Sequence, residues 1–167
     1  MVPYKIFWQT ITYFGDIQYW LGITVAALII YQLISKKNKQ KVAWIILALL
    51  PSIIISSLIV DLLKNLFKIP RSCVGLVGCP ISYSFPSGHA AVVFAFATII
   101  LLFTRKKVLS SLIILLAILV ALSRVFLNYH TVLDITGGSI VGIIISYLFY
   151  LSYKPVHSFL EKKKIIP

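Results

Sequence analysis

Charged residues are scarce in this chain, and their scarcity excludes a soluble globular protein. Only 12% of the 167 residues are charged, whereas 60% are hydrophobic, and the mean hydropathy is +1.00. Soluble domains carry about 25% charged residues and about 45–50% apolar ones. The composition therefore predicts an integral membrane protein.

Acidic residues are scarcer still: four Asp or Glu stand against sixteen Lys or Arg, and the formal net charge is +12. Such a charge can indicate a nucleic-acid partner. Eleven basic residues, however, fall on one side of a topology with five membrane spans: Lys36, Lys37, Lys39, Lys41, Arg105, Lys106, Lys107, Lys154, Lys162, Lys163 and Lys164. The positive-inside rule places them in the cytoplasm. We therefore expect membrane lipids around the protein and no nucleic acid.

Five apolar stretches are long enough to cross a bilayer, which takes about 20 helical residues. They run from Gln18 to Ser35, Val42 to Leu63, Ser87 to Thr104, Val108 to Leu127 and Val132 to Tyr153. Helices are expected because a spanning segment must satisfy its own backbone polar groups. With short connections and no internal repeat, the sequence predicts an all-α integral membrane bundle forming one domain over residues 1–167. No particular oligomeric state is indicated.

Residues 4–16 predict an amphipathic helix ahead of the first span. One face carries Tyr4, Phe7, Trp8, Ile11 and Phe14, and the opposite face carries Lys5, Gln9, Thr12 and Asp16. Such a helix is typical of the membrane interface, and we expect it on the outer surface. The alternative is a ragged start to the first span. No removable signal peptide is expected here.

Small residues predict where helices pack closely. Gly138 and Gly142 are four apart in the last predicted span, and Ala91 and Ala95 are four apart in the third. Such pairs let two helix backbones approach each other. We expect a structural role for them.

The segment from Lys64 to Pro86 contains three prolines and two glycines, which argue against a continuous helix. A loop of this length in a compact chain is usually functional. It holds the only cysteines, Cys73 and Cys79. If the loop lies outside the cytoplasm, a disulfide between them is plausible, and two free thiols are the alternative. A metal site is not expected, because no further Cys or His lies nearby.

Ionisable residues near the ends of spans are costly and therefore indicate function. Lys64 closes the second span, His89 opens the third, Arg124 lies near the end of the fourth and Asp134 opens the fifth. In a five-span topology these ends all face outward. We therefore expect the four side chains to converge at one end of the bundle.

His130 and Asp134 are four residues apart, which places them on one face at a helix start. The carboxylate can accept a hydrogen bond from one imidazole nitrogen and leave the other as a nucleophile. Ser87 and Gly88 follow Pro86, where a helix would begin, and the N–H groups of such a start bind anions. His89 would then be a general acid beside that site.

Lys64 and Arg71 lie on either side of the start of the long loop. Arginine suits multidentate capture of phosphate oxygens, and lysine supplies a point charge. For Lys68, between them, we expect a solvated surface position. Asp61 either orients Lys64 or forms a structural ion pair with it.

Three motifs in this order resemble those of the type 2 phosphatidic acid phosphatase superfamily of membrane lipid phosphatases. They are Lys64-x6-Arg71, Pro86-Ser87-Gly88-His89 and Ser123-Arg124-x5-His130-x3-Asp134. The resemblance implies a phosphohistidine mechanism without metal or other cofactor. In it His130 attacks phosphorus, Asp134 supports His130, and His89 protonates the leaving oxygen. The groups implied to hold the phosphate oxygens are Lys64, Arg71, Ser87, Gly88 and Arg124.

The chain departs from that family in two respects. Ser72 follows Arg71 where members usually have proline, and Pro70 precedes it. Members also commonly have six spans, whereas five are predicted here. By analogy with small microbial members, the expected substrate is a polyprenyl diphosphate of undecaprenyl or dolichyl type, cleaved at the outer face. Phosphatidylglycerol phosphate or phosphatidic acid is the alternative substrate. An alternative of a different class is that the protein is a lipid transporter or a catalytically silent scaffold.

Overall fold

The protein is described here by a computed structural model, which covers residues 3–20, 22–23, 26, 36–75, 78–104 and 106–162. Within these ranges every regular element is helical. The elements are α1 (Pro3–Thr12), the short 3-10 helix η1 (Tyr13–Gly15), α3 (Lys36–Phe67), α4 (Gly88–Phe103), α5 (Lys107–Phe126) and α6 (Val132–Lys162). The predicted all-α fold is confirmed.

Four of the five predicted spans correspond to helices. Three segments are long and apolar enough to cross a bilayer, Ile45–Phe67, Lys107–Phe126 and Val132–Ser152, and Gly88–Phe103 is a shorter apolar helix. The remaining predicted span, Gln18 to Ser35, lies for the most part outside the described residues. Large aliphatic side chains are exposed along α3, α5 and α6, among them Leu58, Leu112 and Ile144, as a surface facing lipid tails requires.

Two helices extend beyond the predicted spans. α3 begins at Lys36, so the basic segment 36–41, expected as a loop, is helical, and α6 continues through the expected tail to Lys162. Lysine and glutamine favour helix, so these ends can extend an apolar helix. At its other end α3 continues past Leu63 to Phe67, which places Lys64 in the last turn of the helix.

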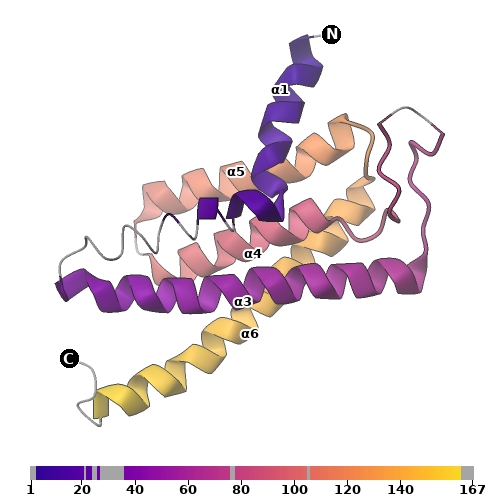
Figure 1. The fold of residues 1–167 in the computed structure, drawn as a ribbon. Coiled ribbons are helices and arrows are strands. Elements are labelled where there is room, and N and C mark those ends of the chain that lie inside the picture. The colour runs from indigo at the N-terminus through magenta and orange to yellow at the C-terminus, as the bar shows by residue number, and fades with distance from the viewer. Residues whose placement is uncertain are drawn as a thin grey trace.

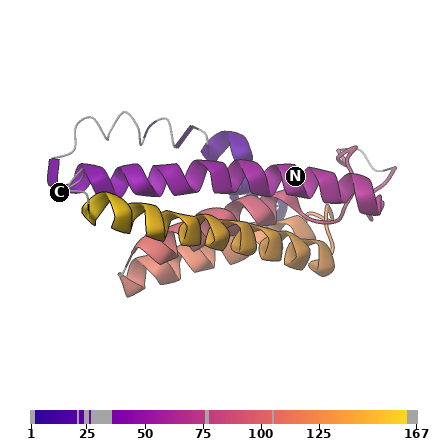
Figure 2. The ribbon, with the colours of Figure 1, turned by 90° about the horizontal axis from the view of Figure 1, so that it is seen from below.

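Helix α4 lies in the middle of the bundle and contacts α3, α5 and α6 (Figures 1 and 2). Its close packing on α6 is confirmed at the predicted small residues. A Cβ added to Gly142 would collide with the carbonyl oxygen of Ala91 and lie 2.9 Å from the backbone nitrogen of Ala95. Buried Ala91 and Ala95 offer the matching flat surface. These contacts fix where α4 begins relative to α6.

Helix α1 turns away from the direction of the bundle (Figure 1) and contacts α5. The ring of Trp8 stacks on Phe126 with centroids 4.4 Å apart, while Phe7 on the same predicted face is 54% exposed. After η1 the backbone at Asp16 is extended. α1 is therefore a separate helix and not the start of the next helical segment. Its position at the membrane surface stays a prediction.

Candidate active site

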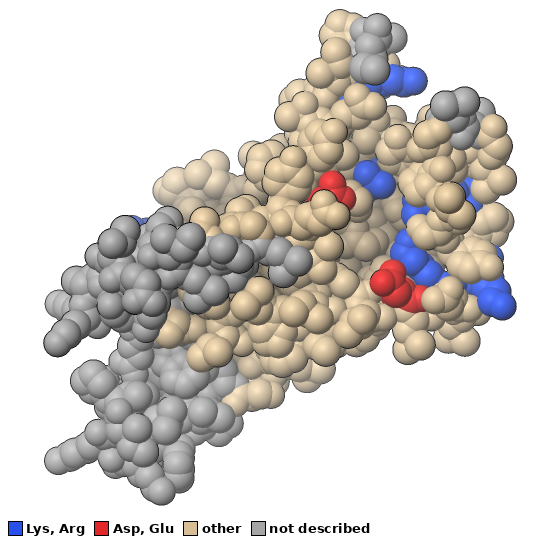
Figure 3. Space-filling model, viewed as in Figure 1, with Lys and Arg blue, Asp and Glu red and all other residues tan. Residues whose placement is uncertain are grey.

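The predicted convergence of ionisable side chains is present at one end of the bundle, where α3 and α5 end and α4 and α6 begin; we refer to it as the loop end. A cavity of about 320 Å³ lies there. Its walls include Lys64, Arg71, His89, Arg124 and His130. Figure 3 shows most of the described Lys and Arg side chains gathered around a hollow at this end, with an uncharged surface along the helices.

Arg71 reaches from the α3–α4 loop to the loop before α6. Its Nε and Nη2 donate to the carbonyl and hydroxyl oxygens of Ser82, at 2.7 and 3.0 Å, and its Nη1 donates to the carbonyl of Tyr129 at 2.7 Å. Nη1 also lies 3.0 Å from Nε2 of His130. Since guanidinium can only donate, Nε2 is the lone-pair nitrogen of His130. Nδ1 then carries the ring proton.

His130 is buried, with 4% of its surface exposed. Burial lowers the pKa of its imidazole, and the nearby charge of Arg71 lowers it further. Both effects disfavour the charged form. The histidine is therefore neutral near pH 7, the form that a nucleophile needs.

The predicted hydrogen bond between His130 and Asp134 is not formed as expected. The distance from Nδ1 to Oδ2 is 3.5 Å, and in the described part of the chain Nδ1 has no hydrogen-bond partner. The reason is that His130 precedes α6 and does not lie on its face. Thr131 caps the helix: its N–H donates to Asp134 Oδ2 at 2.7 Å, and its hydroxyl accepts from the Asp134 N–H at 3.3 Å.

Ser84, which the sequence did not single out, holds the same carboxylate. Its hydroxyl donates to Asp134 Oδ2 at 2.5 Å, and both residues are buried. The main chain of Asp134 has a separate contact, because its carbonyl accepts the Ser87 N–H at 2.9 Å. Asp134 thus links the start of α6 to the start of α4.

Ser87 is the N-cap of α4, and its side chain makes no capping hydrogen bond. Its hydroxyl is buried and has no partner among the described residues. The next N–H groups belong to the first turn of α4, where a helix has no internal acceptors for them. At Gly88 an added Cβ would meet only Val60, at 3.8 Å. This turn combines unpaired donors with open space, as the predicted anion site requires.

Arg124 is buried in the last turn of α5. Its Nη1 donates to the hydroxyl of Thr12 at 2.6 Å, its guanidinium lies 4.8 Å above the ring of Tyr129, and its Nε is unpaired among the described atoms. Its main-chain carbonyl accepts the N–H of His130 at 3.1 Å. Arg124 therefore helps to position His130 while retaining a donor for an anion.

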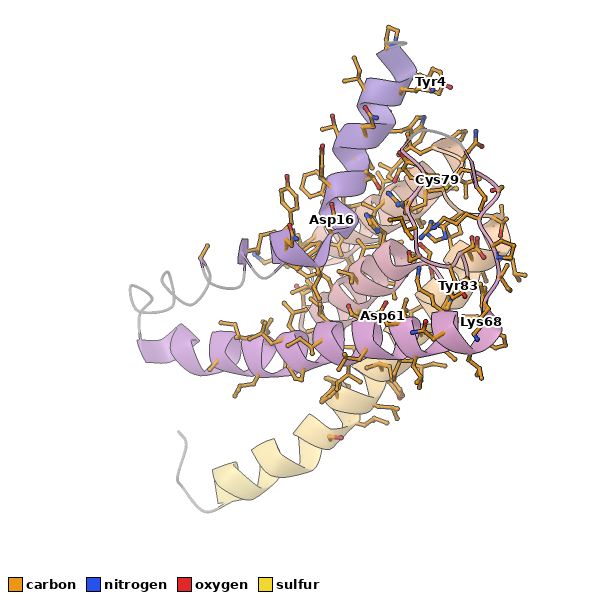
Figure 4. The ribbon with its side chains drawn as sticks, turned by 45° about the vertical axis from the view of Figure 1, so that its right-hand side comes forward. Tyr4, Asp16, Asp61, Lys68, Cys79 and Tyr83 are labelled. Carbon is orange, nitrogen blue, oxygen red and sulfur yellow. A yellow bond between two sulfur atoms is a disulfide. The ribbon has the colours of Figure 1, made fainter. Side chains whose placement is uncertain are left out.

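Lys64 is buried and donates from Nζ to the carbonyl of Tyr83 at 2.8 Å. No ion pair with Asp61 is among its described contacts, so the structural ion pair considered from the sequence is absent there. Lys68 is exposed, as expected, and Figure 4 shows it at the start of the loop, away from Asp16.

Two further features complete the loop end. Cys73 and Cys79 are joined by a disulfide, and the Phe85–Pro86 peptide bond is cis.

His89 bonds through Nε2 to Asp16 Oδ1 at 2.9 Å. Asp16 follows η1, and its hydrogen bond with His89 lowers the pKa of the Asp16 carboxyl. Over the described ranges no cluster of three His, Cys, Asp or Glu residues could hold a metal ion.

Comparisons with known proteins identify the family of this chain. The family model of the PAP2 superfamily matches residues 45–157. An undecaprenyl-diphosphatase of Sulfolobus acidocaldarius is 42% identical over 69 residues, which cover 41% of this chain and 33% of the relative. The bacitracin transport permease protein BcrC of Bacillus licheniformis is 28% identical over 148 residues, covering 87% of this chain and 71% of the relative.

A transmembrane PAP2 type phosphatidylglycerolphosphate phosphatase from Bacillus subtilis has the same fold. The TM-score is 0.77 at 23% sequence identity, and the superposition covers 93% of this chain and 80% of the other. The chain spans about a third of the length of the Sulfolobus relative. Since the family match includes the three motifs and the helices that carry them, this chain belongs to the PAP2 superfamily.

Proposed function

We propose that the chain is a lipid phosphatase that removes the terminal phosphate of a polyprenyl diphosphate at the outer face of the membrane. The observation that carries the proposal is His130, which is neutral and buried, accepts a hydrogen bond from Arg71 at its lone-pair nitrogen, and lines a cavity together with three cations, Lys64, Arg71 and Arg124. The similarity to an undecaprenyl-diphosphatase supports the substrate class. The excess of basic residues at the opposite end of the predicted spans supports the outer face, and residues 1–167 act as one domain.

In the proposed first step, a phosphate oxygen takes the hydrogen bond that Arg71 gives to His130 and so frees the Nε2 lone pair. Nε2 then attacks the terminal phosphorus. A P–N bond forms while the bond from that phosphorus to the bridging oxygen breaks, and His89 protonates that oxygen as the lipid monophosphate leaves. Asp134 stabilises the charge that develops on the His130 ring.

In the second step, His89 takes a proton from water, and the oxygen attacks phosphorus as the P–N bond breaks. Inorganic phosphate is released and His130 regains its lone pair. The charge on the equatorial oxygens is stabilised by the three cations and by the first turn of α4 with Ser87 and Gly88. No step needs a metal ion, so we expect EDTA to leave turnover unchanged.

The test is phosphate release by the purified chain from a panel of undecaprenyl diphosphate, phosphatidylglycerol phosphate and phosphatidic acid. We expect the diphosphate to give the highest kcat/KM and His130→Ala to lower it at least about 1000-fold. His157→Ala is the matched control, because His157 lies near the far end of α6 and should retain full activity. A preference for either monoester would identify the alternative substrate, and an inactive parent chain would favour transport, as the name of BcrC suggests for that relative.

A further inference from the structure

The N-terminal segment Thr12–Asp16 makes three contacts with the candidate active site, although it lies outside the three motifs. Thr12 accepts the hydrogen bond from Arg124, Asp16 accepts the one from His89, and Gly15 lies against the His89 ring. A Cβ added to Gly15 would stand 2.6 Å from Cδ2 of that ring. Gly15 and Asp16 also line the cavity.

Asp16 accepts a hydrogen bond from one specific nitrogen, Nε2, of the His89 imidazole. The bond to Nε2 fixes the plane of the His89 ring and leaves Nδ1 as the nitrogen able to exchange a proton with a reacting group. Two further charged groups act on His89, Arg124 from α5 and Lys64 from α3, and both are positive. Asp16 is the negative group that offsets them.

We infer that Asp16 is a positioning residue for His89, and that the N-terminal segment thereby completes the active site. The inference rests on the proposed function, in which His89 is the general acid. In the first step the doubly protonated ring of His89 gives its Nδ1 proton to the bridging oxygen, while its Nε2–H stays on the ring and remains hydrogen-bonded to Asp16. In the second step Nδ1 takes a proton from water, so the ring returns to its starting state.

Asp16 also differs from the other two aspartates of the described chain. Asp134 is buried and accepts a hydrogen bond from Ser84, while Asp61 lies on α3 without a described ion pair. Figure 4 shows Asp16 on the N-terminal segment and Asp61 on α3, on separate elements. Only Asp16 forms an ion pair with His89 in the described contacts.

The test is a double-mutant cycle with the lipid phosphate that the parent hydrolyses fastest. We expect Asp16→Ala to lower kcat about 10- to 100-fold with little change in KM, and to cause no further loss in a His89→Ala background. Asp16→Glu, which keeps a carboxylate, should recover part of the loss. Gly15→Ala should also lower kcat, because its Cβ displaces the His89 ring.

Glu161→Gln is the matched control, since it removes a carboxylate from the far end of α6 and should leave kcat unchanged. If Asp16→Ala lowers activity equally in the parent and the His89→Ala backgrounds, its role is structural and the inference is wrong. Parent-like kcat in Asp16→Ala would also overturn it while leaving the proposed function intact. A parent chain inactive on every lipid phosphate would overturn the proposed function and this role together.

Discussion

Replacing Ser84 with alanine should disable the site without unfolding the protein. The Ser84 hydroxyl donates to Asp134 at 2.5 Å, and Ser84 is 2% exposed, so water cannot replace the lost donor. A hydrogen bond to a charged group contributes about 1.5–3 kcal/mol. The Asp134 carboxylate would keep only the Thr131 N–H and could move away from His130.

If that whole contribution is felt in the transition state, kcat falls about 10- to 150-fold, because each 1.36 kcal/mol is a factor of about ten. The assay is phosphate release from undecaprenyl diphosphate under saturating substrate, with the melting temperature measured in the same detergent. Ser52→Ala is the matched control: Ser52 is equally buried, its hydroxyl donates to the Leu49 carbonyl in the described part of the chain, and it lies about 18 Å along α3 from Lys64. Turnover of Ser84→Ala within twofold of the parent would refute the role given to this hydroxyl.

Three other perturbations test separate parts of the structure. Gly142→Ala should destabilise the protein by about 1–3 kcal/mol and lower its melting temperature, because the added Cβ collides with Ala91. The control Ile144→Leu, on the exposed side of α6, should leave the melting temperature unchanged. Burial lowers the pKa of His130 from 6.5, so the rate of phosphoenzyme formation, measured by rapid quench, should persist below pH 6.5. A rate that decreases as the pH drops through 6.5 would contradict this. Because the pKa of His130 is lower in the folded protein, His130 takes up a proton more readily in the unfolded chain. The free energy of unfolding should therefore fall as the pH drops through 6.5. An impermeant maleimide should label Cys73 and Cys79 from outside intact cells only after reduction; labelling from the cytoplasmic side alone would reverse the topology.

The sequence predicts most of the fold because the requirements of a bilayer leave few alternatives. Long apolar runs must be helices, and four of the five predicted spans correspond to helices in the structure. The exact helix ends were not predictable from hydropathy: the lysines at the start of α3 are helical although they are polar. Helix propensity and not hydrophobicity decides there.

The candidate site was predictable where its residues belong to motifs and less so where tertiary contacts complete it. His130 and Arg71 carry chemistry that the sequence identifies, but their 3.0 Å contact joins two loops 59 residues apart. Ser84 looked like one serine among many. Asp16 was interpreted as part of a polar helix face, and its one signal was that the whole chain has only four acidic residues.

Asp134 makes two kinds of contact, and they can be separated. In the proposed mechanism its carboxylate stabilises the charge on the His130 ring, whereas its main-chain carbonyl accepts the Ser87 N–H, and any residue placed at 134 keeps that carbonyl. Asp134→Ala should therefore preserve the turn that receives the phosphate while stopping its hydrolysis. Such a variant could serve as a substrate trap: expressed in cells and purified in mild detergent, it would retain its own lipid phosphate for identification by mass spectrometry.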